Sequence, residues 1–444
     1  MREKIILQGE KAIELWQQGK DAWNYWVKQN PEADISFSKV NFSSVGDRSF
    51  REFYFPNGNI SFQDADFGGC NVSFQDANFG DGNVNFKNAN FGEKSVYFKG
   101  AKFGAGDVSF EGANFNDGYV SFEGVNFGDG HVIFSAAKFG QARVCFYNSI
   151  FGKGNVVFFG TLFKEGDVTF EGADFGKGNV SFKEAAFGKG NIIFKHTIFG
   201  QHADFSALRI NKEIKSIDFR YAVFNGSLEF STISEINIIP DFVGTKTTNH
   251  TSFNGLKYKL KRKALFSKVI SENNSESLCR LKEIAESNKD HAMALRFHAD
   301  EMRSKRWQKE RMGTAASLLD WLFDIFSLYG QSIWRPMVGL LLTIATSLLY
   351  TVGFCFPILS PSSYAQWLTN MENISYQTWV YGFEIAVSRA IPFLGGARVD
   401  AAGALTELKP ILSINFSLLS MLFSLLAFVF IFLIGLGLRN RFRL

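Results

Sequence analysis

Apolar and polar positions alternate in a repeat of twelve residues that runs from Ile60 to Phe199. The repeat reads V-x-F-x-x-A-x-F-G-x-G-N, and the x positions inside V-x-F and A-x-F are mostly polar. Period-two alternation is typical of a strand with one buried face. Each repeat therefore predicts two short strands, joined by glycine-rich corners at which the backbone needs conformational freedom.

The repeat predicts a solenoid, because a single copy cannot bury its own phenylalanines and must gain stability from its neighbours. We expect one repeat to form one coil, so that Phe stacks on the Phe twelve residues away. Looser copies extend the array at 35–42 and 48–55, and again at 217–224 and 228–233. The sequence thus predicts a β-helix of roughly 16 coils of ~12 residues over 34–240, on the order of 75 Å long.

The F-x-x-A-[ND]-F element, as in Phe74–Phe79, resembles the pentapeptide-repeat family, whose unit is A-[DN]-[LF]-x-x. The resemblance implies a β-helix. Steps of five and seven residues alternate here instead of steps of five, so a flatter or triangular twelve-residue coil is as well supported as a square one. The tryptophan-rich segment Lys20–Pro31 is similar to a helix that often precedes such repeats. It predicts a capping helix within 1–33, with a membrane-surface helix as the alternative.

Exterior positions are polar in most repeats, but seven positions in the middle of the array are apolar. On a twelve-residue coil they would form adjacent rungs of three exterior ladders, with Ile133, Cys145 and Val157 as three consecutive rungs of one of them. A contiguous apolar patch usually marks an interface. A C-terminal helix of the same chain, another subunit or a protein partner could cover this patch. The predicted interface residues are Ile133, Cys145, Tyr147, Ile150, Val157, Phe159 and Leu162.

The repeat pattern ends near residue 240, and 241–330 is basic with amphipathic helical spacing. This segment resembles the linker between repeats and membrane helices in membrane-bound members of the family, as does the C-terminal GLGLRNRFRL. His291 and His298, close to Asp300 and Glu301, do not have the spacing of a metal site, so a solvated helix face is favoured. Within 331–444, two apolar stretches at about 336–359 and 410–438 are each long enough to span a bilayer.

The second apolar stretch carries serines spaced four, three and four residues apart, on one helical face. Small residues of this kind permit close helix packing or line a pore. The intervening segment 376–396, an apolar helix followed by Pro and Gly-Gly, has the layout of a re-entrant pore loop. A pore would need several copies of the chain, because two spans cannot enclose one. The predicted pore-lining residues are Ser413, Ser417, Ser420 and Ser424, with Ile431 as the gate.

The composition limits the kinds of binding and catalysis that the chain can be expected to perform. The 444 residues carry a net charge of +4, four scattered cysteines and six histidines. That charge is too small to indicate nucleic-acid binding, and the chain shows no catalytic triad, metal motif or nucleotide motif. The phosphate-loop-like Gly176–Asn179 has aspartate in place of its lysine in other repeats, as at Asp81, so it is a corner of the coil. We therefore expect no enzyme, cofactor or metal.

Arginines and lysines precede the first apolar stretch and follow the second, which predicts that both termini and the β-helix lie in the cytoplasm at an inner membrane. The leading hypothesis is a homo-oligomeric, channel-like membrane protein with a cytosolic β-helix for sensing or assembly. The alternative is a membrane-tethered scaffold whose β-helix binds a protein partner. A DNA-mimicking inhibitor, known among soluble pentapeptide-repeat proteins, is disfavoured because lysines interleave with the acidic residues.

Overall fold

The structure is a computed structural model. It describes residues 4–43, 48–260, 274–308, 312–355, 376–391, 395–408 and 414–442. The side chains of 48, 353–355, 378, 395–398, 407–408 and 414–420 lie outside this description. The chain divides into two compact units, Met1–Lys305 and Arg306–Leu444.

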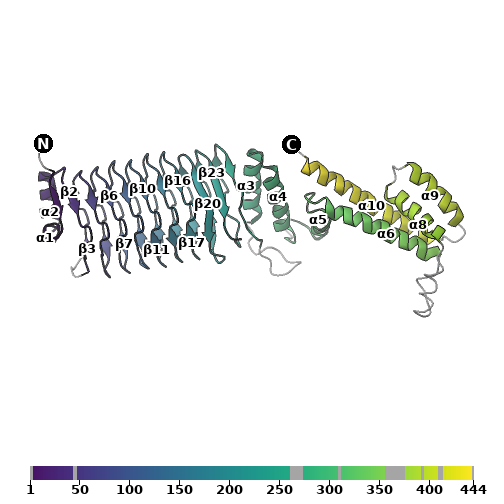
Figure 1. The fold of residues 1–444 in the computed structure, drawn as a ribbon, viewed down its shortest axis with the longest axis horizontal. Helices are drawn as coiled ribbons and strands as arrows, with labels where there is room; N and C mark the ends of the chain where they lie inside the picture. The colour runs from purple at the N-terminus through teal and green to yellow at the C-terminus, as the bar shows by residue number, and fades with distance from the viewer. Residues whose placement is uncertain are drawn as a thin grey trace. The chain divides into compact units, whose positions relative to one another are not determined.

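The first unit contains a parallel β-solenoid of about ten turns, which confirms the predicted fold class (Figure 1). Four ladders of short strands or single bridges run along it, here called ladders A to D. Ladder A consists of β2 (Asp34–Ser36), β4 (Ile60–Ser61), β6 (Val84–Asn85), β8 (Val108–Ser109), β10 (Val132–Ile133), β13 (Val156–Val157), β16 (Val180–Ser181), β20 (Ala203–Ile210), β23 (Leu228–Thr232) and β25 (Thr251–Ser252).

The other three ladders complete each turn. Ladder B contains β11 (Lys138–Phe139), β14 (Leu162–Phe163), β17 (Ala186–Phe187) and the end of β20. Ladder C contains β3 (Arg48–Ser49), β5 (Val72–Ser73), β7 (Val96–Tyr97), β9 (Val120–Ser121), β12 (Val144–Cys145), β15 (Val168–Thr169), β18 (Asn191–Ile193) and β21 (Ser216–Asp218). Ladder D ends in β19 (Ile198–Phe199), β22 (Val223–Phe224) and β24 (Lys246–Thr247), and single bridges extend ladders B and D toward the N-terminus.

One turn contains two repeats, so the expected coil of about twelve residues is wrong. Val84 pairs with Val108, and Val108 with Val132, always 24 residues on. The flat or triangular coil is also wrong, because each turn contributes to four ladders. The physical reason is that each V-x-F or A-x-F segment forms only one side, and four sides are needed to enclose the phenylalanines. About ten turns give a rod of roughly 48 Å rather than 75 Å.

The core is a column of aromatic rings. Phe86 and Phe110, in successive turns, stack with ring centroids 4.8 Å apart and planes 1° apart. Phe86 and Phe98, on opposite sides of the column, meet edge to face at 5.6 Å. Both arrangements suit the quadrupole of the ring. The corners pack as closely: a Cβ on Gly178 would lie 1.9 Å from the carbonyl oxygen of Gly154, so these positions require glycine.

The N-terminal end of the solenoid is covered by β1 (Ile6–Gln8), which pairs with β2, and by two helices rather than one, α1 (Glu10–Gln17) and α2 (Lys20–Gln29). Trp16 stacks on Phe50, and Trp23 stacks on Phe37. The indole of Trp23 donates a hydrogen bond to the carbonyl oxygen of Tyr54 at 2.8 Å. These contacts place both tryptophans over the first turn, where they shield its aromatic core.

The C-terminal end of the solenoid extends past residue 240 to β25 and is covered by α3 (Asn274–Ser287) and α4 (His291–Lys305). Leu278 and Leu281 of α3 are fully buried, and Phe297 of α4 meets Phe253 edge to face. The guanidinium of Arg280 donates a hydrogen bond to the carbonyl oxygen of Thr245. The two helices expected to form a linker are therefore part of the solenoid's own core.

The second unit is helical, with α5 (Thr314–Ser327), α6 (Trp334–Cys355), α8 (Tyr376–Ala390), α9 (Gly395–Leu408) and α10 (Ile414–Arg441). Helix α6 packs against α8 and α10, and α8 packs against α9. Two helical segments are long and apolar enough to cross a membrane, Trp334–Val352 and Met421–Arg441. They overlap the two apolar stretches predicted from the sequence, beginning two residues before the first and ending three residues after the second. The parts of these stretches at 356–359 and 410–413 lie outside the described residues.

Candidate functional site

The seven predicted interface residues do not form one patch. Ile133 and Val157 are paired on ladder A, whereas Cys145 is paired with Ser121 and Thr169 on ladder C. The predicted run of three consecutive rungs is therefore wrong, because residues twelve apart lie on opposite sides of a 24-residue turn. The residues divide into a first exterior group, Ile133, Val157, Phe159 and Leu162, and a second, Cys145, Tyr147 and Ile150.

The first exterior group spans ladders A and B. Phe159 is 45 % exposed and Leu162 is 37 % exposed, so no described part of the first unit covers them. Leu162 also lines a groove of about 470 Å³ that runs over β14, β17 and the end of β20. Ile233, itself exposed, and the charged Arg209 line the same groove. This face therefore combines apolar contact area with a concave surface.

The second exterior group spans ladders C and D. Tyr147 and Ile150 are exposed, whereas Cys145 is buried. Ile150 bridges to Asp174, which bridges to the exposed Ile198, so a charged rung interrupts the apolar ones on ladder D. This group is therefore smaller than the first.

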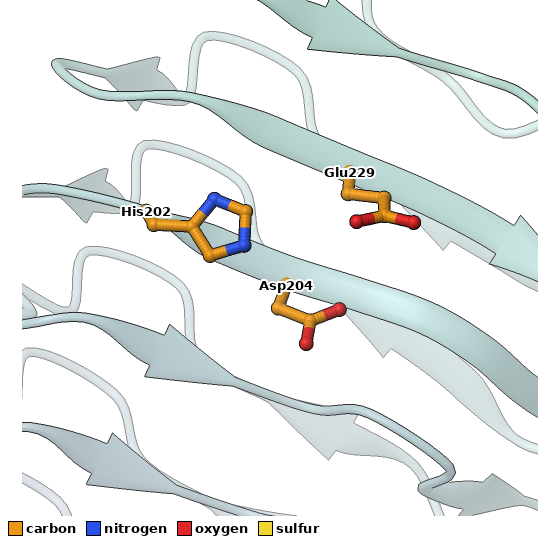
Figure 2. A group of neighbouring side chains, drawn as sticks. All are labelled: His202, Asp204 and Glu229. Atoms are coloured by element: carbon orange, nitrogen blue, oxygen red, sulfur yellow. The ribbon is translucent and has the colours of Figure 1, made fainter.

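A cluster that the sequence analysis did not select lies on ladder A (Figure 2). The ligand atoms of His202, Asp204 and Glu229 lie within 4.8 Å of one another. Asp204 and Glu229 are directly paired on β20 and β23, and His202 immediately precedes β20. The available signal was the repeat itself, because Asn or Ser occupies the corresponding positions in most earlier turns, although Ile133 and Val157 occupy one of them in two turns.

Helices α3 and α4 carry a buried carboxylate in the segment where a solvated helix face was expected. That expectation holds for His291 and His298, which are exposed, but is wrong for Glu301, which is buried. Burial alone would raise the pKa of Glu301, but the nearby His298 and the hydrogen bonds from Lys305 and Lys282 outweigh it and hold the pKa well below its usual range. These groups act as an ion-pair network between two helices.

A second buried ion-pair network joins the start of the second unit to α5. Arg306 is 4 % exposed and contacts both Asp320 and Asp324, the latter at 2.9 Å. The hydroxyl of Tyr329 accepts a hydrogen bond from Arg306 and donates one to Asp320. A buried guanidinium needs such partners to offset the loss of its hydration. The network fixes α5 against the turn that leads to α6.

The serine stripe of α10 is described only in part. Ser413 lies outside the described residues, and the side chains of Ser417 and Ser420 are not described. Ser424 is half-buried, and the next stripe position, Ala427, is fully buried. Ile431, the predicted gate, is half-buried. The pore-lining and gating roles of these residues remain predictions.

Helix α6 carries a small-residue stripe of its own, which the sequence analysis missed. Gly339, Thr343, Ser347 and Thr351 follow one another at intervals of four residues, and the three hydroxyl-bearing members are buried. Thr343 and Thr351 donate hydrogen bonds to the carbonyl oxygen four residues earlier, each at 2.8 Å. Gly339 lies against the ring of Phe430 on α10. Small residues here permit close approach of the two apolar helices.

Comparison of the sequence with models of protein families found no match, and comparison with curated proteins found none either. The solenoid fold rests on the strand register, and the pentapeptide-repeat family remains a resemblance of the repeat motif. The solenoid together with two candidate membrane helices is compatible with a membrane-associated protein.

Proposed function

We propose that this protein is a non-catalytic, membrane-anchored scaffold, in which α6 and α10 hold the chain in the bilayer and the solenoid binds a protein partner. The observation that supports membrane anchoring is the exposed apolar surface of these two helices. Leu341 and Leu342 on α6 are at least 60 % exposed, as are Leu425, Phe428 and Phe432 on α10. Lipid is the solvent that suits such a surface.

The anchoring is tested by alkaline carbonate extraction of membranes from cells that express the full chain. The wild type is expected to stay in the membrane pellet. A variant with Leu425→Lys, Phe428→Lys and Phe432→Lys is expected to be released, because a charge costs about 2.5–3.5 kcal/mol at the centre of a membrane helix. The matched control, Phe159→Lys with Leu162→Lys, adds charge to the solenoid and should stay in the pellet. Extraction of the wild type would contradict the anchor.

We place the solenoid on the cytoplasmic side. Arg439 and Arg441, in the last turn of α10, are exposed and positively charged, and basic residues favour the cytoplasmic end of a membrane helix. Single cysteines introduced at Ser109 and at Asn440 in a cysteine-free chain test this placement. Both should react with a membrane-impermeant maleimide only after the cells are opened. Labelling of intact spheroplasts would place these ends outside.

The docking surface of the scaffold is the first exterior group and its groove. A photoreactive amino acid at Phe159 or Ile233 is expected to give a discrete cross-linked product in cells, whereas one at Ser109, a polar rung of the same ladder A, should not. The mass of the product distinguishes a second copy of this chain from another protein. Equal cross-linking at all three positions, or none, would contradict a specific docking surface.

A channel-like oligomer is the second candidate, and one feature of α10 favours it. Gly435 continues the serine stripe of α10. A Cβ on Gly435 would meet no atom within 4 Å, so the described helices leave this part of the serine stripe uncovered. In liposomes, Ile431→Ser is expected to raise ion flux if Ile431 is the gate. The control Leu425→Ser changes an exposed residue off the stripe and should have no effect. Absence of flux from all three proteins would exclude the channel and leave the anchor intact.

A further inference from the structure

Ladder A changes its chemistry near its C-terminal end. The outward position of its strands is small, polar and uncharged in most turns, as in Ser61, Asn85, Ser109 and Ser181. In the next two turns this position is occupied by Asp204 and then Glu229. A second position, two residues before Asp204, changes as well. It is Asn155 and Asn179 in the two preceding turns and His202 in this one. Three metal-ligating residue types therefore replace the repeat's usual residues at one place.

The two carboxylates lie side by side without a compensating positive charge. Asp204 and Glu229 are directly paired across neighbouring strands, where like charges are destabilising. Several other acidic residues of the solenoid pair with a lysine one turn away, as Glu123 does with Lys99 at 2.9 Å. Among the described residues, neither Asp204 nor Glu229 has a lysine or arginine within ion-pair distance. A bound cation would relieve this repulsion.

The imidazole is held in an orientation that suits metal binding. Nδ1 of His202 is 2.7 Å from the hydroxyl oxygen of Ser227. The other ring nitrogen is on the side of the ring nearest the two carboxylates (Figure 2). A hydrogen bond at one ring nitrogen orients the imidazole and leaves the other nitrogen available to a metal. One oxygen of Asp204 accepts a hydrogen bond from the backbone N–H of Ser206 at 2.9 Å, which positions that carboxylate as well.

We propose that His202, Asp204 and Glu229 bind a divalent transition metal ion, with Zn²⁺ as the best match. An imidazole nitrogen together with carboxylate oxygens suits zinc, whereas calcium and magnesium prefer oxygen alone. Zinc–ligand distances of about 2.0–2.2 Å require ligand atoms roughly 3–3.5 Å apart, and the exposed Glu229 can close the remaining distance. The ion would join β20 to β23 and keep a coordination position open on the surface of ladder A. This site is independent of the proposed anchoring function.

The test uses the full chain, purified in detergent without a polyhistidine tag and dialysed against EDTA. Calorimetric titration with ZnCl₂ is expected to show one equivalent bound with a micromolar dissociation constant. His202→Asn, Asp204→Ser and Glu229→Ser each introduce the residue type found at the same position in a neighbouring turn, so the solenoid should keep its fold. Each is expected to weaken binding at least tenfold. His131→Asn, at the position of His202 three turns earlier, is the matched control and should bind zinc as the wild type does.

Two further readouts keep the proposal falsifiable if a variant unfolds. Zn²⁺ should raise the melting temperature of the wild type and of His131→Asn. Co²⁺ added to the wild type should give a visible absorption band that Zn²⁺ removes, a measurement that needs no variant. The proposal is overturned if the wild type binds no zinc at 100-fold molar excess, or if the three site variants bind it as tightly as the wild type.

Discussion

Phe110 and Phe134 stack face to face, with ring centroids 4.8 Å apart and planes 5° apart, although 24 residues separate them. Phe122, halfway between them in sequence, meets Phe110 edge to face at 5.5 Å and Phe134 at 5.4 Å. Each core phenylalanine thus touches rings above, below and across the column. Because every turn supports its neighbours in this way, the solenoid depends on an unbroken aromatic column.

Removal of one ring from the middle of the column should be costly. Phe134→Ala is expected to lower the free energy of unfolding of the first unit by about 3–5 kcal/mol, because the ring is fully buried and its loss leaves a cavity. Urea denaturation followed by circular dichroism measures the change. Phe159→Ala, which removes the exposed ring one position after the core residue Phe158, should change stability by no more than about 0.5 kcal/mol. Equal losses for both variants would contradict the aromatic column.

The 24-residue turn can be checked by cysteine pairing. In a chain without its native cysteines, Asn85→Cys with Ser109→Cys should form a disulfide under mild oxidation, because the two residues are directly paired on neighbouring strands about 4.8 Å apart. Asn85→Cys with Tyr97→Cys, only twelve residues apart, should not, because Tyr97 is on ladder C. Mobility on a non-reducing gel distinguishes the two. A bridge in the second pair alone would restore the twelve-residue coil.

The solenoid could be predicted from the sequence, but the number of repeats per turn could not. The V-x-F segments at Val84 and Val96 have the same chemistry, yet they belong to ladders A and C. Periodicity therefore fixes which residues point inward without fixing which residues are neighbours. The same ambiguity led to the placement of Cys145 beside Ile133, although the two lie on opposite sides of the turn.

The His202–Asp204–Glu229 cluster was outside the reach of sequence patterns for a related reason. Glu229 is 25 residues beyond Asp204, and only the strand register brings them together. The small-residue stripe of α6 could not be selected from the sequence for another reason. Gly339 and Thr343 are residue types that are common in membrane helices, and only the contact of α6 with α10 shows what they do. In both cases the residue types were visible and the contacts were not.

The buried carboxylate of Glu301 predicts a pH-dependent stability for the first unit. The pKa of Glu301 is lower in the folded state than in the unfolded state. The ionised carboxylate therefore stabilises the folded state when the pH is above the ordinary carboxyl pKa, and this stabilisation is lost as the pH falls toward the lower pKa of the folded state. At pH 7, Glu301→Gln is expected to cost about 3 kcal/mol, because Lys282 and Lys305 lose their partner. Denaturation at several pH values should show this difference shrinking below about pH 4.5. Glu276→Gln, an exposed position on α3, is the control and should show a small difference at every pH.

The close contact of α6 with α10 predicts a size limit at Gly339. A Cβ there would lie 2.4 Å from the ring of Phe430, so Gly339→Ile must separate the helices and is expected to destabilise the second unit by about 1–3 kcal/mol. Thermal stability in detergent, followed by the fraction that stays monodisperse after heating, measures the effect. Gly403→Ala on α9, where a Cβ meets no atom within 4 Å, should be neutral or stabilising.

Phe430→Ala combined with Gly339→Ile completes the test, because it removes the ring that the larger side chain would displace. If the loss at Gly339 comes from this contact, the double variant should be more stable than the sum of the two single losses predicts, by about 0.5–3 kcal/mol. Additive losses would show that isoleucine at 339 acts through the backbone of α6 alone. Such a result would leave the apolar helices in contact but would remove the reason for glycine at their crossing.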